Sequence, residues 1–297
     1  MKALSLIIAT YNRAQWVLET LESVAAQKSP ASEWECVVVN NNSTDNTSEV
    51  VEAFIASHPE LDIRLVVETK QGLSHARNCG IENSTGAVVA IIDDDELIND
   101  EFIGAYISLF ERNAHIASAG GRIVARYRSA RPAWMSPYTE RPIANPMDFG
   151  AAECEFPAVR IPGGGNMAIR RSALEKYGVF NPELGRQGQK LIGGEENDLF
   201  ERLKAGGERC WYTPAAVMYH LIPDEKLTRD YLTRLSYNIG ISQRRRATIE
   251  GRGYLTSEVV KWVGTLLIAL GYALTLRPQK GAYVVLMRYH ITRGLLA

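Results

Sequence analysis

The first part of the chain alternates short apolar runs with longer segments of mixed polarity. The runs are rich in Val, Ile and Leu and nearly free of polar residues, which is typical of parallel strands covered on both faces. Each run is followed by a segment long enough for a helix, and this order predicts right-handed βαβ units in a doubly wound, mostly parallel α/β sheet. The predicted strand and helix pairs are 4–9 and 14–27, 36–39 and 46–57, 63–67 and 73–83, and 87–92 and 100–112.

The pattern changes in the second half of the chain. Residues 126–160 are rich in Pro, Arg and aromatic residues and have too little periodicity to assign, so we expect a mobile or substrate-facing loop. Apolar spacing predicts a helix over 195–205 that ends at a glycine pair, and 211–220 is expected to be extended. Long helical patterns follow at 227–246, 257–276 and 281–295. These patterns place a domain boundary near residue 223, between a domain of 1–223 and a helical region of 224–297.

Composition is typical of a globular cytosolic protein. With 297 residues, of which 46% are hydrophobic and 23% charged, the chain can bury a large core. Its four cysteines stand apart, without a C-x-x-C pair, which argues against a disulfide scaffold and a zinc ribbon and favours a reducing compartment. The apolar segment 4–9 is too short for a secretory signal peptide.

Charge is distributed unevenly along the chain, although the net charge is only −1. Residues 226–297 contain twelve Lys or Arg against three Asp or Glu, which gives +9 in this region and −10 in the rest. A basic region can bind nucleic acid or an anionic membrane. Because this one is interleaved with a long apolar run, we expect an anionic membrane surface as its partner and no nucleic acid.

The apolar run in the tail bears on the kind of membrane contact. Residues 262–276 carry no charge over fifteen positions, about 22 Å of helix at 1.5 Å per residue, whereas the hydrocarbon core is about 30 Å thick. We therefore expect peripheral or monotopic attachment at the cytoplasmic face of the membrane, with Trp262 and Tyr272 as interfacial anchors. A tilted or re-entrant insertion and a buried core helix are the alternatives.

Polar clusters follow the ends of the four predicted strands, where open α/β sheets bind ligands. They comprise 10–13, 40–45, 68–72 and 93–96. In the last cluster, Asp93, Asp94, Asp95 and Glu96 come directly after a buried strand, and a hard divalent cation with oxygen ligands relieves such crowding of carboxylates. The alternative is an acidic turn that caps the next helix, but the position at a strand end favours a metal site.

Other polar residues are candidates for chemistry, each with a structural alternative. Glu195 and Glu196 follow a glycine pair at a helix start, where one of them would act as a general base or both would only complement the helix dipole. His220 follows an extended apolar run and is either a metal or diphosphate contact or a structural histidine. Tyr11 would stack on a base or sit in a turn, and Arg77 would pair with a phosphate, with the acidic cluster or with solvent.

Taken together, these residues resemble the family 2 glycosyltransferases, which have the Rossmann-like GT-A fold, over about residues 3–245. The resemblance lies in LSLIIATYNR at 4–13, NNSTDNT at 41–47, GLSHARNCGI at 72–81 and GGGNMAIRR at 163–171. It implies a nucleotide-sugar donor site, a bound Mg²⁺ or Mn²⁺ and a catalytic base. The implied donor-binding residues are Thr10, Tyr11, Asn12, Arg13, Asn40, Asn42, Arg77, Asp93, Asp94, Gly164 and Asn166; the metal ligands are Asp95, Asp93 and His220; the base is Glu196, with Glu195 as the alternative.

Asp93 and Asp95 match the D-x-D of the family, which would make Asp95 the main metal ligand and put Asp94 near the ribose. Two other positions depart from the family pattern. Glu196, however, stands where the family usually has the Asp that is its base, and Asn40 stands where an Asp commonly reads the nucleobase.

The implied reaction is an inverting, metal-dependent transfer from a UDP-linked sugar to a hydroxyl of a glycan or lipid-linked acceptor, in cell-surface polysaccharide or glycolipid synthesis. Residues 1–125 would bind the donor, 126–223 would form the acceptor side, and 224–297 would associate with the membrane. A dinucleotide-dependent oxidoreductase would need G-x-G-x-x-G after the first strand, which Thr10-Tyr11-Asn12 does not supply. A catalytically silent sugar-nucleotide-binding protein on the same fold stays an alternative because of Glu196.

Overall fold

The computed structural model describes residues 2–186, 193–249 and 255–297. The chain forms two compact units. The first contains Met1–Val124, Met147–Gly188 and Glu195–Leu221, and the second contains Ala125–Pro146, Gln189–Gly194 and Ile222–Ala297. The end of the first unit at Leu221 lies close to the domain boundary expected near residue 223. Residues 125–146, which we expected on the acceptor side of the first domain, belong instead to the second unit.

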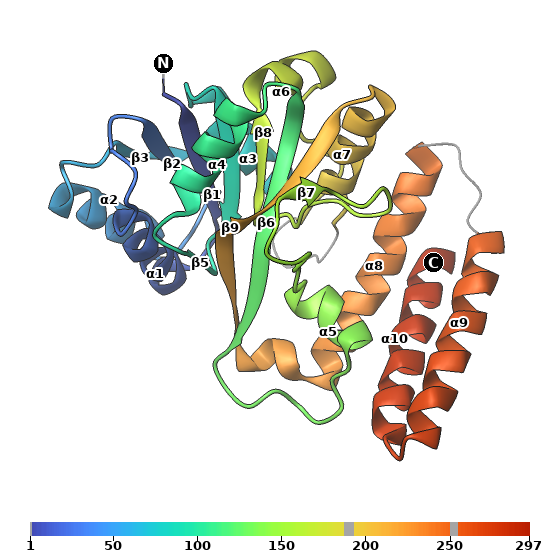
Figure 1. The fold of residues 1–297 in the computed structure, drawn as a ribbon. Coiled ribbons are helices and arrows are strands. Elements are labelled where there is room, and N and C mark those ends of the chain that lie inside the picture. The colour runs from blue at the N-terminus through green and yellow to red at the C-terminus, as the bar shows by residue number, and fades with distance from the viewer. Residues whose placement is uncertain (1, 187–192, 250–254) are drawn as a thin grey trace. The chain divides into compact units, whose positions relative to one another are not determined.

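The first unit is built on a mixed sheet in the order β3-β2-β1-β4-β8-β6-β9-β5, with β7 paired to β9 (Figure 1). β3, β2, β1 and β4 are parallel neighbours, β8 is antiparallel to β4 and β6, and β5 and β7 are antiparallel to β9. The strands are β1 Leu4–Thr10, β2 Trp34–Asn40, β3 Ile63–Val67, β4 Val88–Asp93, β5 Glu96–Ile98, β6 Ile116–Tyr127, β7 Cys154–Glu155, β8 Met167–Arg170 and β9 Arg209–Ile222.

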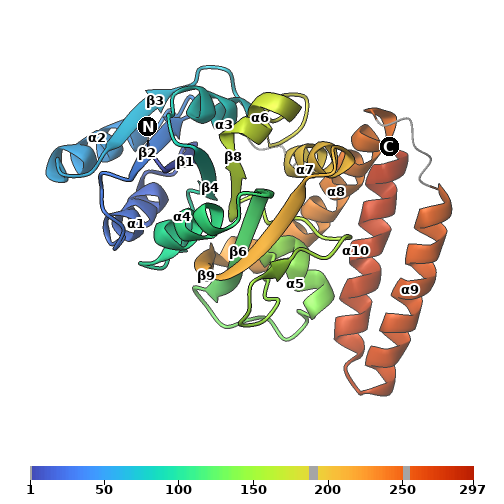
Figure 2. The same cartoon turned by 45° about the horizontal axis from the view of Figure 1, so that its top comes forward.

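Helices cover both faces of this sheet, with α3 on one side and α1 on the other (Figure 2). β1 and β2 are buried along their whole length, as expected for strands between two helical layers. The helices of the unit are α1 Ala14–Ala25, α2 Thr47–Ser57, α3 Leu73–Glu82, α4 Phe102–Arg112, α6 Arg171–Tyr177 and α7 Glu195–Ala205. The predicted α/β fold is confirmed, and the antiparallel strands beyond β4 are an addition to it.

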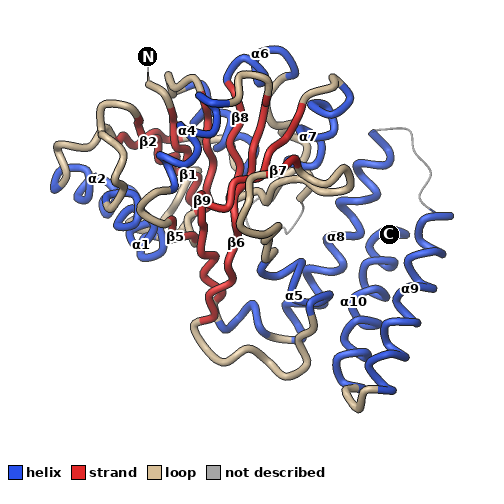
Figure 3. The backbone as a smooth tube through the Cα atoms, viewed as in Figure 1, coloured by secondary structure: helices blue, strands red, loops and turns tan. Residues whose placement is uncertain are grey.

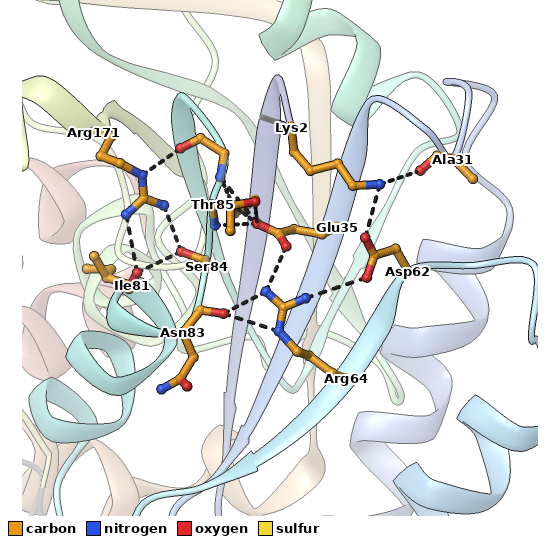
Figure 4. Close-up of polar contacts among 12 residues, drawn as sticks. Lys2, Ala31, Glu35, Asp62, Arg64, Ile81, Asn83, Ser84, Thr85 and Arg171 are labelled. Atoms are coloured by element: carbon orange, nitrogen blue, oxygen red, sulfur yellow. Dashed lines mark hydrogen bonds and ion pairs between the residues drawn. The ribbon is translucent and has the colours of Figure 1, made fainter.

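A buried carboxylate joins three strands at the edge of the sheet where the parallel strands begin (Figure 4). Glu35 on β2 accepts hydrogen bonds from Ser5 Oγ at 2.6 Å, Arg64 Nη2 at 2.7 Å and Thr85 Oγ1 at 2.9 Å. Burial alone would raise the pKa of Glu35, but these hydrogen bonds outweigh it and lower the pKa to about 2. The ionised form therefore stabilises the edge opposite to the predicted site.

The described residues of the second unit beyond β9 are mostly helical (Figure 3). They form a short 3₁₀ helix, Asp224–Leu227, and three long helices, α8 Arg229–Ile249, α9 Leu255–Leu274 and α10 Pro278–Leu296, while α5 Pro137–Ala144 comes from the earlier segment. Met135 and Ile143 share an apolar cluster with Leu232 of α8. Trp134 stacks on Tyr283 of α10 with the two ring centroids 4.5 Å apart. This shared core explains why 125–146 groups with the second unit.

Candidate active site

The register of the parallel strands brings three predicted residues to one edge of the sheet. Thr10 pairs with Asn40 across β1 and β2, and Ala9 pairs with Asp93 across β1 and β4. Because parallel strands all point the same way, their carboxyl ends meet here, and the loops that follow them converge. The predicted location of the site at this edge follows from the pairing.

The acidic cluster after β4 is largely buried. Asp94, Asp95 and Glu96 are each less than 10% exposed, whereas the side chain of Asp93 is about one-third exposed at 35%. Burial raises the pKa of Asp94 above its ordinary value, and the charges of Asp95 and Asp93 add to this although Arg13 and Thr10 lower it. Burial and the charges of Asp93 and Asp95 also raise the pKa of Glu96.

Arg13 lies against this cluster. Its Nη1 is 2.8 Å from Asp95 Oδ2 and 3.3 Å from Asp94 Oδ1, while Thr10 Oγ1 donates to Asp94 Oδ2 at 2.8 Å. The guanidinium therefore binds the carboxylate that the sequence assigned as the main metal ligand. A cation that enters this position has to compete with Arg13.

Arg77 of α3 connects three segments that are far apart in sequence. Its side chain is 1% exposed. Nη1 donates to Glu195 Oε1 at 3.0 Å, and Nη2 donates to Asp93 Oδ1 at 2.9 Å and to the main-chain oxygen of Gly164 at 3.1 Å. The alternative that Arg77 is a solvated surface charge is wrong, because its guanidinium group is buried among acidic side chains.

Glu195 and Glu196 open α7. Burial and the charge of Glu196 raise the pKa of Glu195, although Arg77 lowers it. Across the described residues, Oε2 of Glu195 and Oε2 of Glu196 are both buried without a hydrogen-bond partner. Glu196 Oε1 lies 3.5 Å from the point where a Cβ atom on Gly164 would stand. Glu196 thus has one carboxylate oxygen near a residue without a side chain and another without a hydrogen-bond partner among the described residues, an arrangement suited to accepting a proton from a substrate.

Close packing at the turn before β8 requires glycine at position 165 and favours it at position 164. A Cβ atom on Gly165 would lie 2.0 Å from Glu96 Oε1, so any other residue would displace the buried carboxylate. A Cβ atom on Gly164 would lie 3.3 Å from Arg77 Nη2. The turn therefore allows Glu96, Arg77 and Glu196 to approach one another.

The predicted metal ligands are only partly assembled. His220 Nε2 lies 3.9 Å from Asp95 Oδ1, while Asp93 is bound to Arg77. In the described part of the chain, no three Asp, Glu, His or Cys side chains converge closely enough to hold a metal ion by themselves. Six carboxyl groups, those of 93–96 and 195–196, nevertheless lie around the guanidinium groups of Arg13 and Arg77. An Mg²⁺ ion commonly uses one or two carboxylates and completes its shell with water and substrate phosphates, and this donor set fits that mode.

The family model described as Glycosyl transferase family 2 matches residues 5–178, which include the strand ends, Arg77 and the acidic cluster. The chain belongs to this family. Its fold is the GT-A fold of glycosyltransferases, and it is a transferase of the EC 2.4 class. The segments that resemble the family in sequence, from 4–13 to 163–171, lie within the matched range except for residue 4.

Individual relatives agree with this assignment. The chain is 27% identical over 254 residues to the glucosyl-dolichyl phosphate glucuronosyltransferase of Haloferax volcanii, covering 81% of this chain and 76% of that protein. It is 25% identical over 249 residues to the succinoglycan biosynthesis protein ExoM of Rhizobium meliloti, covering 83% of this chain and 75% of that protein. The structure of mannosyltransferase PcManGT from Pyrobaculum calidifontis, in complex with GDP-Man and Mn²⁺, has a TM-score of 0.65 over 97% of this chain and 86% of that chain, at 21% identity. That likeness concerns the fold alone.

In this glycosyltransferase, four of the predicted donor-binding residues lie at the end of β2 or in the loops after β1 and β2. Asn12 and Asn42 are exposed and have positive φ angles of 52° and 63°, and Asn12 Oδ1 accepts from the amide of Thr44 at 2.7 Å. Tyr11 is half-buried. Asn40 is buried, and its side chain accepts from the Ser43 amide at 2.9 Å and donates to the hydroxyl of Ser48 on α2 at 2.7 Å. Their contact with a donor stays a prediction.

Asn166 does not lie among the charged side chains. It is fully buried, its Oδ1 accepts from Tyr106 Oη at 2.5 Å, and its Nδ2 donates to the main-chain oxygens of Arg122 at 3.0 Å and Ala216 at 3.1 Å. These bonds use the donors and one acceptor position of the amide. The structure therefore gives Asn166 a role in positioning the glycine turn, and its predicted donor contact would require those bonds to change.

Two residues of the predicted polar clusters were given no individual role from the sequence, and the structure shows that they position other parts of the site. Asn41 is buried, donates to the main-chain oxygens of Glu68 and Lys70 at 3.0 and 2.8 Å, and accepts from the Gly72 amide at 2.8 Å. It thereby fixes the loop that leads into α3. Glu96 accepts from the Asp93 amide at 2.8 Å. The signal for both was their place at a strand end, next to residues that were chosen.

Proposed function

We propose that this glycosyltransferase transfers a sugar from a UDP-linked donor to a hydroxyl of a glycan or lipid-linked acceptor, with inversion at the anomeric carbon and with Mg²⁺ or Mn²⁺. The observation that supports this most strongly is the convergence of Asp93, Gly164 and Glu195 on the buried guanidinium of Arg77. It brings the acidic strand end and the start of α7 together around one centre, which a single displacement requires.

In the proposed reaction, the acceptor oxygen forms a bond to the anomeric carbon while the bond from that carbon to the diphosphate breaks. The electron pair of the broken bond leaves with the diphosphate, and the acceptor proton passes to Glu196. A divalent cation, when bound, would neutralise charge that develops on the diphosphate. Asp95, with Asp93 and His220, would hold that cation, and Arg13 would turn from Asp95 toward the diphosphate.

The choice of Glu196 over Glu195 as the base rests on their different surroundings. Glu195 is bound to Arg77 at 3.0 Å, so its carboxylate is held inside the protein by an ion pair. Each glutamate has one buried oxygen without a hydrogen-bond partner among the described residues, and Glu196 lies beside Gly164. The side chain of Glu is one methylene longer than the Asp usual in the family, and the absence of a side chain at Gly164 provides room for that longer arm.

The acceptor class and the pathway are suggested by the relatives. One is named for transfer to glucosyl-dolichyl phosphate and another for succinoglycan biosynthesis. We propose that this chain likewise acts in cell-surface polysaccharide or glycolipid synthesis, on an acceptor presented at the cytoplasmic face of the cell membrane.

A thermal-shift experiment with a panel of nucleotide sugars, with and without Mn²⁺, tests the proposal. A ligand that binds only the folded protein raises Tm, so a UDP-sugar with Mn²⁺ should raise Tm more than either alone. The Asp95→Asn variant should lose the part of the rise in Tm that needs Mn²⁺. A shift with GDP-sugars alone would contradict the UDP assignment. A shift of equal size with and without Mn²⁺ would contradict metal dependence.

A further inference from the structure

Helix α9 exposes its apolar side chains instead of burying them. Val263, Leu267 and Leu270 are 55%, 63% and 56% exposed. With residues spaced about 100° apart on a helix, the exposed apolar positions fall within an arc of roughly 120°. The exposed apolar face consists of Val259, Val260, Val263, Leu266, Leu267, Leu270 and Leu274. Within the described residues, Ser257–Leu274 is also the one helix long and apolar enough to cross a membrane, and only 11% of it is buried.

The opposite side of α9 carries polar side chains that pack on α10. Glu258 is buried, and its Oε1 accepts from Thr292 Oγ1 at 2.9 Å and pairs with Arg288 Nη1 at 3.2 Å. Trp262 Nε1 donates to Thr292 Oγ1 at 2.9 Å, and Thr265 is buried on the same side. The indole N–H of Trp262 is therefore used inside the hairpin, which argues against its predicted role as an interfacial anchor.

This polarity is the reverse of that found in a helix on the surface of a soluble protein, which buries its apolar stripe and exposes its polar side. A contiguous apolar surface of this kind marks an interaction site. Polar side chains that pair inside a hairpin while aliphatic side chains face outward are typical of helices in contact with lipid.

The charge of the hairpin distinguishes between two occupants of this face. Residues 255–297 contain five Lys or Arg and one Glu, a net charge of +4, and the single Glu is buried against Arg288. Lys261 and Arg277 lie near the two ends of the exposed apolar face and are themselves exposed. A second copy of the hairpin would bring like charges together, whereas an anionic lipid surface complements them.

We propose that α9 lies in the plane of an anionic membrane, with its exposed apolar face among the lipid chains and α10 above it. The face from Val259 to Leu274 is about 22 Å long at 1.5 Å per residue, shorter than the roughly 30 Å of hydrocarbon that a spanning helix has to cross. α10 has Arg288 at its middle, so the hairpin has no second apolar helix to return across the bilayer. This inference deepens the proposed location of the reaction and does not depend on the donor or the base.

Flotation of the full-length protein with vesicles tests the inference. Binding should be strong on vesicles of phosphatidylcholine mixed with phosphatidylglycerol, weak on phosphatidylcholine alone, and reduced by high salt. The combined variant Leu266→Gln, Leu267→Gln and Leu270→Gln should bind at least about tenfold more weakly, because it removes apolar surface without changing charge. Val67→Gln is the matched control: Val67 is 57% exposed on β3, and its substitution should leave binding unchanged.

The pair Lys261→Gln and Arg277→Gln tests the charge separately and does not depend on the folding of the leucine variant. It should weaken binding to the anionic vesicles and leave the donor-dependent rise in Tm unchanged. Failure of the wild-type protein to float with anionic vesicles would overturn the inference. So would a dimer in solution that the leucine variant dissociates, and so would retention on vesicles after alkaline carbonate extraction, which indicates a spanning helix.

Discussion

Arg77 Nη1 lies 3.0 Å from Glu195 Oε1, and both side chains are almost completely buried. The same guanidinium binds Asp93 at the end of β4, so that one positive charge connects the two acidic segments of the site. Ion pairs inside a protein contribute to stability only when every charged group is compensated. The first prediction follows from this arrangement.

Arg77→Ala should lower the free energy of unfolding by about 3–5 kcal/mol, because it leaves the carboxylates of Asp93 and Glu195 buried without their partner. Urea denaturation followed by circular dichroism measures the change. Arg112→Ala is the control: Arg112 pairs with Glu153 at 3.0 Å but is 57% exposed, and its loss should change stability by less than about 0.5 kcal/mol. Equal effects of the two substitutions would show that the Arg77 cluster has no special role in stability.

Arg13→Met should strengthen the binding of Mn²⁺ in the absence of nucleotide by about tenfold, or ~1.4 kcal/mol. The reason is competition, since Arg13 Nη1 is bound to Asp95 Oδ2 at 2.8 Å. Calorimetric titration with MnCl₂ alone gives the affinity, and Arg13→Lys, which keeps the positive charge, should bind Mn²⁺ less tightly than Arg13→Met. Weaker Mn²⁺ binding by Arg13→Met would mean that Asp95 is not the ligand.

Glu35 should make stability depend on pH in the acid range. Its pKa in the folded protein is about 2, below the ordinary value of 4.5, so the ionised form is favoured by folding. A lowered pKa contributes stability that is fully present above about pH 4.5 and is lost as the pH falls toward 2. The shift corresponds to about 3 kcal/mol. The difference in unfolding free energy between the wild-type protein and Glu35→Gln should therefore be large at pH 7 and much smaller at pH 3. A difference that does not change with pH would contradict this account.

The sequence predicted the parallel half of the sheet well because its strands are continuous apolar runs between turn residues. It did not predict β6, whose centre contains Gly120 and Gly121, residues that usually weaken a strand. The structure explains the pair, because a Cβ atom on Gly121 would lie 2.0 Å from the main-chain oxygen of Ala216 and one on Gly120 would lie 2.7 Å from Pro162. Such close approaches depend on tertiary packing, which periodicity does not report.

The candidate site was predictable in its membership and less so in its contacts. Strand ends identified Asp93 to Glu96, and a glycine pair at a helix start identified Glu195 and Glu196. The bond between Arg77 and Glu195 joins residues 118 positions apart, and no local pattern encodes it. The saturation of the Asn166 amide by Tyr106 and two carbonyl groups likewise depends on segments that meet only in the folded chain.

The same limit applies to the helical tail. The length and charge of its apolar run could be read from the sequence. Which side of α9 faces α10 depends on Glu258, Trp262 and Thr292 meeting across the hairpin, and that was not predictable from the run alone.

The most direct test of the central claim is the turnover of sugar transfer by Glu196→Gln, with donor affinity measured on the same preparation. Removal of a group that accepts a proton in the transition state should lower kcat by about 10²-fold or more and leave the Kd of the donor nearly unchanged. Glu195→Gln, by contrast, should lower stability, because it removes the partner of Arg77. A Glu196→Gln enzyme with wild-type kcat, or with its loss confined to donor binding, would contradict the assignment of Glu196 as the base.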